Sequence, residues 1–190
     1  MNTNGGLFAN DITFVYVTVV ENSGTQVNST DNGSDAGSLT SFGSIVAKPT
    51  SGGSNCTFGP SGTTTSNGYN FSDDASASVG CKFNQATDLV GPGNDPQLAP
   101  LANNGGPTQT RMPSPTSPVV DAIPTSNCSF AGVTVDQRGV TRPVGPRCDI
   151  GSVETKGVPR TKDDCKDGGW QNLVDDQGRP FKNQGDCVSF

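Results

Sequence analysis

Three runs of strand-forming residues recur along the chain at a nearly constant spacing. Each run has an apolar or aromatic centre: Val19-Val20 in residues 11–21 (DITFVYVTVVE), Ile45-Val46 in residues 39–48 (LTSFGSIVAK), and Asn70-Phe71 in residues 63–71 (TTTSNGYNF). β-Branched and aromatic side chains favour strands over helices. The centres lie 26 and 25 residues apart, which matches one coil of a β-solenoid, where each coil stacks its strands on the coil before. Strands of an antiparallel sandwich at coincidental spacing are the alternative.

The segment between the first two runs, residues 22–38, consists mainly of Asn, Ser, Thr, Asp and Gly. A composition this polar cannot supply a core of its own. We therefore expect this segment to be a loop that projects from the body of the protein.

The overall composition favours short strands joined by many turns. Hydrophobic residues make up 31% of the sequence and aromatic residues 6%, which is lean for a globule with one thick core. Glycine (25 residues) and proline (14 residues) are well above their ordinary usage. These residues are typical of turns rather than of long helices.

Charge and the absence of histidine exclude several classes of function. The net charge is −6, with 12 Lys and Arg against 18 Asp and Glu, so the surface repels phosphate backbones and we expect no nucleic-acid binding. The sequence contains no His. This absence excludes Ser-His-Asp and Cys-His catalysis and imidazole metal ligands.

The chain contains six cysteines, none at the CxxC spacing of a zinc site or a thioredoxin-like motif. Six cysteines allow many connectivities, but their spread favours bonds between sequence neighbours: Cys56 with Cys81, Cys128 with Cys148, and Cys165 with Cys187. Each bond would close a loop of about 20 to 26 residues and contribute roughly 3 kcal/mol. Disulfides predict an exported, oxidising destination.

The beginning of the sequence does not resemble a signal peptide. Met1 is followed by Asn-Thr-Asn-Gly-Gly, with no charged region and no apolar run, and no stretch is long and apolar enough to cross a membrane. We expect the chain to be the tail of a longer polypeptide whose export signal lies upstream, and its location to be extracellular or at the cell surface. A mis-started reading frame is the alternative.

Residues 94–154 carry five short motifs in a fixed order. They are DPQL from Asp95, LANNGGPTQT at 101–110, SPVVDA at 117–122, DQRGVTRP at 136–143, and CDIGSVE at 148–154. This series resembles the choice-of-anchor Q domain, whose proteins are bacterial, exported, and carry right-handed parallel β-helix coils ahead of this segment. The strings IVAKPTSGGSNC, SNGYNF and CKF resemble the last coils of that family, where a cysteine pair brackets the segment, in support of a bond between Cys56 and Cys81. The resemblance covers roughly residues 7–154.

The resemblance implies an all-β fold: the last coils of a right-handed parallel β-helix (β-solenoid) with an irregular, disulfide-stapled C-terminal cap. We expect terminal coils in residues 1–48, the last coil and a choice-of-anchor Q-like cap in residues 49–154, and a linker with a Cys-bracketed tail in residues 155–190. A cap is required because an uncovered last coil would expose unpaired strand backbone.

Five charged residues of this cap are candidates for a structural clamp: Arg138, Arg142, Asp136, Asp149 and Glu154. Bidentate pairs between arginine and carboxylate would hold an irregular segment that has few ladder hydrogen bonds. A ligand-binding arginine is the alternative interpretation.

The string NNGGP at residues 103–107 predicts a rigid reversal of the chain. Its glycines permit positive φ angles, and its proline fixes the direction of exit.

The last segment departs from the sorting devices best known after this family's domain. It has neither an LPxTG string nor a hydrophobic helix with a basic end, and it finishes CKDGGWQNLVDDQGRPFKNQGDCVSF. This ending resembles a short Cys-bracketed tail that closes many exported bacterial proteins. Trp170 and Phe181 are expected to pack over the Cys165–Cys187 bridge, which supplies the staple that so small a segment needs. A surface contact of Trp170 with sugar or peptide is the alternative.

The function we expect is a non-catalytic extracellular or cell-surface module, structural or adhesive, that caps a parallel β-helix. Its partners would be upstream coils of the same polypeptide and a glycan or another cell-surface component. We assign no catalytic, cofactor-binding or metal-binding residues. Ca²⁺ held by loop carboxylates and carbonyls is the one cofactor option kept, although no DxDxDG or RTX-type string occurs.

The alternative function is the C-terminal fragment of a carbohydrate-active β-helix enzyme, a polysaccharide lyase or hydrolase with its active site on upstream coils. Lyases of this architecture hold Ca²⁺ with acidic side chains stacked on successive coils. The candidates near the final coils are Asp73, Asp74, Asp88 and Asp95. Loops and glycines separate them, so the sequence does not align them on one face.

Overall fold

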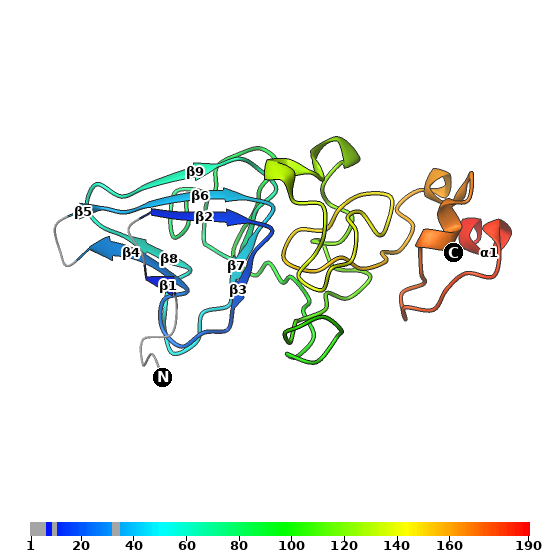
Figure 1. Cartoon of the computed structure of the whole chain (residues 1–190), viewed down its shortest axis with the longest axis horizontal. Coiled ribbons are helices and arrows are strands. Elements are labelled where there is room, and N and C mark those ends of the chain that lie inside the picture. Colours follow the sequence, from blue (N-terminus) through cyan, green and yellow to red (C-terminus); the bar gives the residue numbers. More distant parts are fainter. Residues whose placement is uncertain (1–6, 9–10, 32–34) are drawn as a thin grey trace. The chain divides into compact units, whose positions relative to one another are not determined.

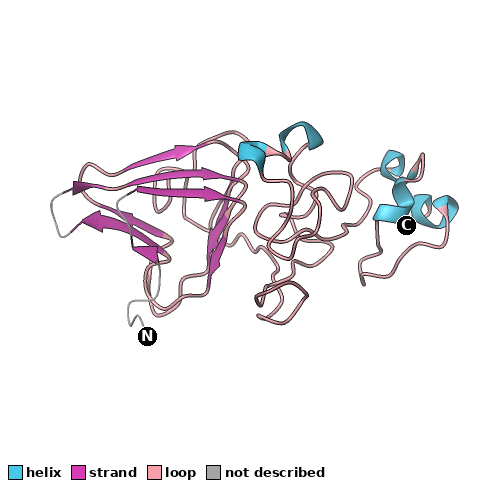
Figure 2. Ribbon diagram, in the orientation of Figure 1, coloured by secondary structure: helices cyan, strands magenta, loops and turns pink. Residues whose placement is uncertain are grey.

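The computed structural model of the chain describes residues 7–8, 11–31 and 35–190. The chain divides into two compact units, residues 1–94 and 95–190 (Figure 1). The described strands all lie in the first unit, and the second consists of loops and short helical turns (Figure 2). The divisions expected from sequence, after residues 48 and 154, fall within these units. None of the helices in the described ranges is long and apolar enough to span a membrane.

The first unit is built from parallel sheets. Its strands are β1 (Leu7–Phe8), β2 (Asp11–Val15), β3 (Thr18–Val20), β4 (Val27–Asp31), β5 (Asp35–Ala36), β6 (Ser38–Phe42), β7 (Ile45–Ala47), β8 (Cys56–Phe58), β9 (Thr63–Ser66), β10 (Phe71–Ser72) and β11 (Leu89–Val90). They form the sheets β1-β4-β8, β2-β6-β9 and β3-β7-β10-β11, and β5 joins the first of these as an antiparallel neighbour of β4. The chain visits the three sheets in rotation, through β2, β3 and β4 and then through β6, β7 and β8.

In the sheets β2-β6-β9 and β3-β7-β10, neighbouring strands are one sequence repeat apart. Asp11 pairs with Ser38, 27 residues later, and Ser38 pairs with Thr63, 25 residues later. Each of the three strand-like runs divides into two strands at a corner, so that the run at residues 39–48, for example, contains β6 and β7. The strands pair in parallel, and the chain passes through the three sheets in a fixed order. An antiparallel sandwich has neither feature.

The register of the third sheet differs by one residue from the alignment made on apolar centres. Ile45 pairs with Thr18 and with Phe71, whereas the sequence spacing had placed it opposite Val19 and Asn70. The alignment was wrong because Asn70 belongs to the corner before β10, where its buried side chain accepts hydrogen bonds from the Ser41 hydroxyl (2.7 Å) and the Ser44 amide (3.2 Å). A one-residue slip in a strand reverses which side chains face the core.

The corner between the second and third sheets repeats a left-handed backbone conformation. Its φ angle is 56° at Tyr16, 58° at Gly43 and 56° at Tyr69. The rings at this corner also stack edge to face, with centroids 5.5 Å apart for Tyr16 and Phe42 and 5.8 Å apart for Phe42 and Tyr69. These contacts between successive repeats help to hold a conformation that is uncommon for non-glycine residues.

The segment at residues 22–38 is not a projecting loop. It contains β4, which pairs with both β1 and β8, and Val27 is fully buried in the core. The buried Gln26 side chain donates to the Ala47 carbonyl at 2.9 Å. The prediction was wrong because ladder hydrogen bonds and one apolar anchor suffice for a strand between two others. Residues 32–34 of the segment lie outside the described residues.

The apolar interior of the first unit is narrow. Burial alternates along β2, so that Ile12 and Phe14 point inward. The core cluster comprises Ile12, Phe14, Val19, Val27, Leu39, Val46, Cys56, Cys81 and Phe83. Its last two members follow β10 in the chain, and the bond between Cys56 and Cys81 ties them to β8.

The second unit is irregular. Its helical turns are η1 (Thr125–Asn127), η2 (Phe130–Gly132), η3 (Lys162–Cys165), η4 (Gly169–Asn172) and α1 (Gln184–Val188). Isolated antiparallel bridges such as Ile123 with Cys148 replace extended ladders, and a disulfide joins Cys128 to Cys148. In the tail, Cys165 is bonded to Cys187. All three bonds therefore join the sequence neighbours that were expected to pair.

The tail has a small core of its own. Cys165, Leu173, Phe181 and Cys187 are buried together, and Trp170 and Val188 pack against them while remaining partly exposed. Trp170 thus occupies the mini-core position expected from sequence, and part of its ring also reaches the surface.

Candidate functional site

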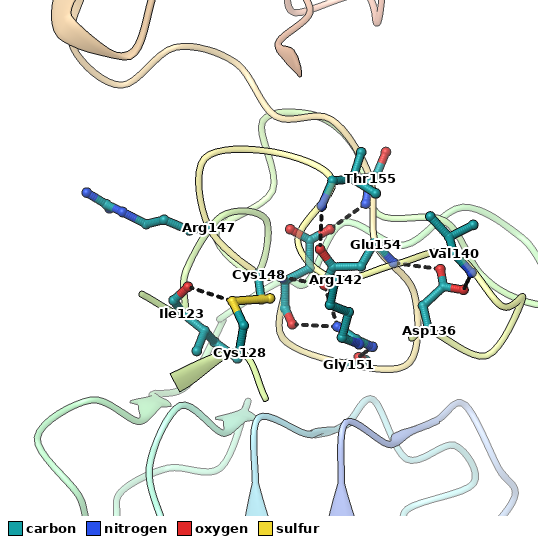
Figure 3. Close-up of polar contacts among 12 residues, drawn as sticks. Ile123, Cys128, Asp136, Val140, Arg142, Arg147, Cys148, Gly151, Glu154 and Thr155 are labelled. Carbon is teal, nitrogen blue, oxygen red and sulfur yellow. Dashed lines mark hydrogen bonds and ion pairs between the residues drawn. A yellow bond between two sulfur atoms is a disulfide. The ribbon is translucent and has the colours of Figure 1, made fainter. Parts of the chain in front are cut away.

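The candidate site is a buried cluster of charged side chains in residues 121–155, for which we use the name carboxylate cluster. Its members are Asp121, Asp136, Arg138, Arg142, Asp149 and Glu154. All but Asp121 are among the five residues predicted from sequence to form a clamp. The structure brings them together in a part of the chain without extended strands. Figure 3 shows Asp136, Arg142 and Glu154 of this cluster.

Asp136 organises the turn that begins the cluster. Its Oδ1 accepts the backbone amides of Arg138 (2.7 Å) and Val140 (3.0 Å). Its Oδ2 accepts the Arg138 guanidinium through Nε (3.0 Å) and Nη2 (2.8 Å). Burial opposes ionisation of this carboxyl, but the Glu154 amide and the Arg138 side chain outweigh it and hold the pKa of Asp136 below its ordinary value.

The same aspartate and arginine hold the backbone of Glu154. The Glu154 amide donates to Asp136 Oδ2 at 3.0 Å, and the Glu154 carbonyl accepts Arg138 Nη2 at 2.5 Å. Both backbone groups of Glu154, its N–H and its C=O, are thus hydrogen-bonded to this pair of side chains. This is the same pair of groups that a neighbouring strand would satisfy in a sheet.

The Glu154 side chain is paired with Arg142 in the interior. The two side chains are 0% and 1% exposed, and Arg142 Nη1 donates to Glu154 Oε1. Arg142 also donates to the Gly151 carbonyl at 2.8 Å. Glu154 accepts the amides of Val144 (3.1 Å) and Asp149 (2.9 Å). Breaking a pair this deeply buried would leave an uncompensated charge.

Asp149 links two further segments to the pair. Its carboxylate accepts the amides of Asp121 and Thr155, each at 2.7 Å. Burial, followed by repulsion from the Glu154 carboxylate, raises the pKa of Asp149 well above its ordinary value. The pKa of Glu154 is raised as well, because burial outweighs the opposing attraction of Arg142.

Asp121 is the member that sequence reasoning missed. It is 2% exposed and adopts a left-handed φ of 52°. Its Oδ1 accepts the Arg147 amide at 3.1 Å, whereas its Oδ2 is buried without a hydrogen-bond partner in the described ranges. Burial raises the pKa of Asp121 to about 6, against the opposing hydrogen bond from the Arg147 amide. The signal was available, since Asp121 is the acidic residue of the motif SPVVDA.

The Arg147 side chain is not part of the cluster. Its guanidinium extends away from Glu154 and Arg142, although its backbone amide contributes to the site (Figure 3). The cluster therefore contains three buried carboxylates of raised pKa and one fully buried arginine. Its carboxylates mainly accept backbone amides that regular secondary structure would otherwise satisfy.

The NNGGP reversal rests against the cluster. Gly106 has a φ of 77°, and a Cβ atom at this position would lie 2.7 Å from Arg138 Cα. Arg138 also donates from Nη1 to the Asn104 carbonyl at 3.5 Å. The glycine is therefore needed both for its backbone conformation and for its close approach to Arg138.

A small cavity of about 210 Å³ adjoins Asp121. It is lined by Pro115, Thr116, Ser117, Pro118, Val120, Asp121, Gly157, Val158 and Arg160. Gly157 closes tightly on the carboxylate, because a Cβ there would lie 2.3 Å from Asp121 Oδ2. The backbone at Gly157 therefore covers Asp121 Oδ2 and leaves no room for a large ligand beside this atom.

The acidic candidates from the alternative, enzymatic interpretation have other partners. The Asn55 side chain donates from Nδ2 to Asp73 at 2.7 Å and to Asp74 at 2.9 Å, and Asp88 accepts the Asn70 backbone amide at 2.8 Å. Asp95 lies in the second unit and accepts the Gln97 amide. Within the described residues, no three acidic, cysteine or histidine side chains are grouped as they would be around a metal ion.

Comparisons of the chain with protein-family models, with curated proteins and with solved structures found no match. The interpretation of the site therefore depends on its own geometry.

Proposed function

We propose that the protein is a non-catalytic extracellular module that forms the last coils of a right-handed parallel β-helix and closes its end. The observation that carries this proposal is the rotation of the chain through three parallel sheets, with neighbouring strands 25 to 27 residues apart in β2-β6-β9 and in β3-β7-β10. A repeat that buries its apolar residues only against its neighbours is the unit of a solenoid.

The end of the stack supports closure. After β10, the chain carries Cys81 and Phe83 into the core of the first unit, and Phe83 is 1% exposed. The bond between Cys81 and Cys56 fixes this segment to β8. A large aromatic residue held in this way covers apolar surface that an open last coil would expose.

The opposite side of the sheets supports the presence of further coils. β2 and β3 stand at the ends of their sheets and pair on one side only with described strands. Unpaired edges of this kind invite pairing with another strand. Upstream coils of the same polypeptide would continue both sheets.

The carboxylate cluster supports a structural role for residues 95–154. The carboxylates of Asp136, Asp149 and Glu154 accept hydrogen bonds from backbone amides. Asp136 also accepts from Arg138, and Glu154 from Arg142. Such a clamp gives an irregular cap the order that ladders give the coils. The resemblance of this segment to the choice-of-anchor Q domain is in keeping with this role.

The location and size of the native product test the proposal. Cells and medium are fractionated, and an antibody to residues 96–154 is used on non-reducing gels. The expected product is much larger than 19.5 kDa, is disulfide-bonded, and is found at the surface or in the medium. A reduced 19.5 kDa protein in the cytosol would overturn the extracellular assignment.

Closure of the stack is tested in the full chain with Phe83→Asp. We expect association that increases with protein concentration in sedimentation velocity, because the apolar end becomes accessible. Val79→Asp is the matched control, since Val79 lies in the same segment but is exposed. The double variant Cys56→Ser/Cys81→Ser opens the segment without burying a charge and should associate in the same way. Monomeric, folded behaviour of both variants would refute the closing role.

A further inference from the structure

The tail repeats the turn that organises the carboxylate cluster. In the first turn, Asp136 Oδ1 accepts the amides two and four residues later at 2.7 and 3.0 Å. In the tail, Asp175 Oδ1 accepts the amides of Gln177 at 2.9 Å and Arg179 at 2.8 Å. Both turns close with an isolated antiparallel bridge, Val135 with Thr141 and Val174 with Pro180. Both also place a guanidinium on the second carboxylate oxygen.

The two turns differ in what this pair of side chains holds. Asp136 and Arg138 grip the N–H and the C=O of Glu154, as described above. In the tail, Arg179 Nε donates to Asp175 Oδ2 at 2.6 Å, and the guanidinium has no further hydrogen bond to the described chain. The Arg179 side chain is 69% exposed. The second turn therefore presents a similar aspartate–arginine pair, with the arginine four residues after the aspartate instead of two, and this pair binds no further backbone segment of the described chain.

The open pair lines a groove of about 520 Å³, which we name the tail groove. Its lining residues are Asp175, Asp176, Arg179, Pro180, Phe181, Lys182, Asp186, Ser189 and Phe190. This volume falls in the range of about 300 to 1,000 Å³ that is usual for ligand sites.

The other side chains of the tail groove indicate what it can hold. Phe190 is 57% exposed and lies edge to face against buried Phe181, with centroids 5.5 Å apart. This ring offers an exposed apolar surface. Asp176 and Asp186 are exposed, and the lining carries three carboxylates against two basic side chains. A ligand with apolar and basic side chains complements this surface.

We propose that the tail groove binds an extended peptide segment that carries apolar and basic side chains. Asp175 Oδ2 accepts a backbone N–H of the peptide, and Arg179 donates to the C=O of the same residue, as Asp136 and Arg138 do with Glu154. An apolar side chain of the peptide covers Phe190, and a basic one faces Asp176 and Asp186. The site stands independently of the capping role, because all its residues belong to the tail.

The probe is a fluorescein-labelled peptide of alternating leucine and lysine, seven residues long and blocked at both ends. Its binding to the full chain is followed by fluorescence anisotropy. Arg179→Ala and Phe190→Ala are each expected to weaken binding about tenfold or more, since a hydrogen bond to a charged group or a buried ring is lost. Lys166→Ala is the matched control, because Lys166 is an exposed basic residue of the tail outside the groove.

Two modified probes separate the contributions of backbone and charge. The same peptide with every backbone amide N-methylated cannot donate to Asp175 and should lose binding. The version with glutamate in place of lysine should bind at least tenfold more weakly. The emission of Trp170 reports whether each variant keeps the tail core.

Three outcomes would overturn the proposal. The first is no binding of the leucine–lysine peptide by a chain whose tail is folded. The second is binding that survives both N-methylation and Arg179→Ala. The third is assignment of the groove to a different occupant. That result would follow if a neutral oligosaccharide such as cellohexaose displaced the peptide. It would also follow if sedimentation velocity showed that a second copy of the chain occupies the groove.

Discussion

Arg142 and Glu154 form an ion pair whose side chains are almost completely removed from solvent. The pair lies in a segment with only isolated bridges, so it performs a task that sheet ladders perform in the first unit. Glu154 accepts two backbone amides in addition to Arg142, and its own backbone is held by Asp136 and Arg138. Side chains and backbone amides from residues 136–149 thus converge on Glu154.

Replacement of one partner of this pair is expected to be severe. Arg142→Met leaves the Glu154 carboxylate buried without a counter-charge and should lower the free energy of unfolding by about 3–5 kcal/mol. The double variant Arg142→Met/Glu154→Leu should recover much of the loss, because it buries no charge. Guanidinium unfolding followed by far-ultraviolet circular dichroism measures both. Lys166→Ala, which breaks an exposed pair with Asp163, should have no measurable effect. A small loss in Arg142→Met would contradict the clamp.

The carboxylate cluster should make the second unit more stable in mild acid. The folded pKa of Asp121 is about 6, above its unfolded value near 4. A carboxyl with a raised folded pKa contributes stability that is fully present below the unfolded pKa and is lost as pH rises through the folded pKa. Asp149 and Glu154 shift in the same direction. Stability should therefore fall between about pH 4 and pH 6, by an amount on the order of 2–3 kcal/mol for Asp121.

Asp121→Asn tests this assignment. Asparagine resembles the protonated acid, so the variant should be at least as stable as the unchanged chain at pH 7 and should show a smaller change between pH 4 and pH 6. Arg147 and Arg160 attract the Asp121 charge, and Asp164 repels it. Hydrogen exchange of amides in residues 119–155, measured at several pH values, gives the local stability. An identical pH dependence in both proteins would refute the role of Asp121.

The sequence predicted those features that depend on local pattern. The spacing of β-branched runs indicated the repeat, and the order of cysteines indicated the bonded pairs. The five residues of the predicted clamp are close together in the structure. The motif SPVVDA marks Asp121 in the sequence but does not predict its burial, which follows from a left-handed turn packed beneath Gly145 and Gly157. Long-range backbone geometry of this kind leaves little trace in composition.

The errors in the first unit have a similar origin. The strand β4 lies in a stretch of polar residues, and it forms because its neighbours β1 and β8 complete its hydrogen bonds. The register of β10 depends on the side chain of Asn70, which fills a corner instead of a strand position. In both cases the local sequence gives competing conformations of nearly equal free energy, and contacts with tertiary neighbours determine which one forms.

The tail should depend on its disulfide. The double variant Cys165→Ser/Cys187→Ser removes the bond from a core of only four buried residues, at a cost of roughly 3 kcal/mol. We expect the tail to open while the rest of the chain stays folded. Trp170 is the sole tryptophan of the sequence, so its emission should shift to longer wavelength. Cys128→Ser/Cys148→Ser is the matched control and should leave that emission unchanged. An unshifted spectrum in the first variant would mean that apolar packing alone holds the tail.

Gly106 and Gly105 offer a comparison that separates backbone strain from close packing. Both have positive φ angles, 77° and 91°. Because this backbone conformation is unfavourable for alanine, a substitution at either position should lower the free energy of unfolding by about 1–3 kcal/mol. Only Gly106 lies against Arg138, where the new Cβ would be 2.7 Å from the Arg138 Cα, whereas nothing lies within 4 Å at Gly105. Gly106→Ala should therefore destabilise the chain more than Gly105→Ala, and it should loosen the grip of Arg138 on Glu154. Faster hydrogen exchange at the Glu154 amide in Gly106→Ala alone would identify this packing contact as the cause, whereas equal effects of the two variants would assign the whole loss to backbone conformation.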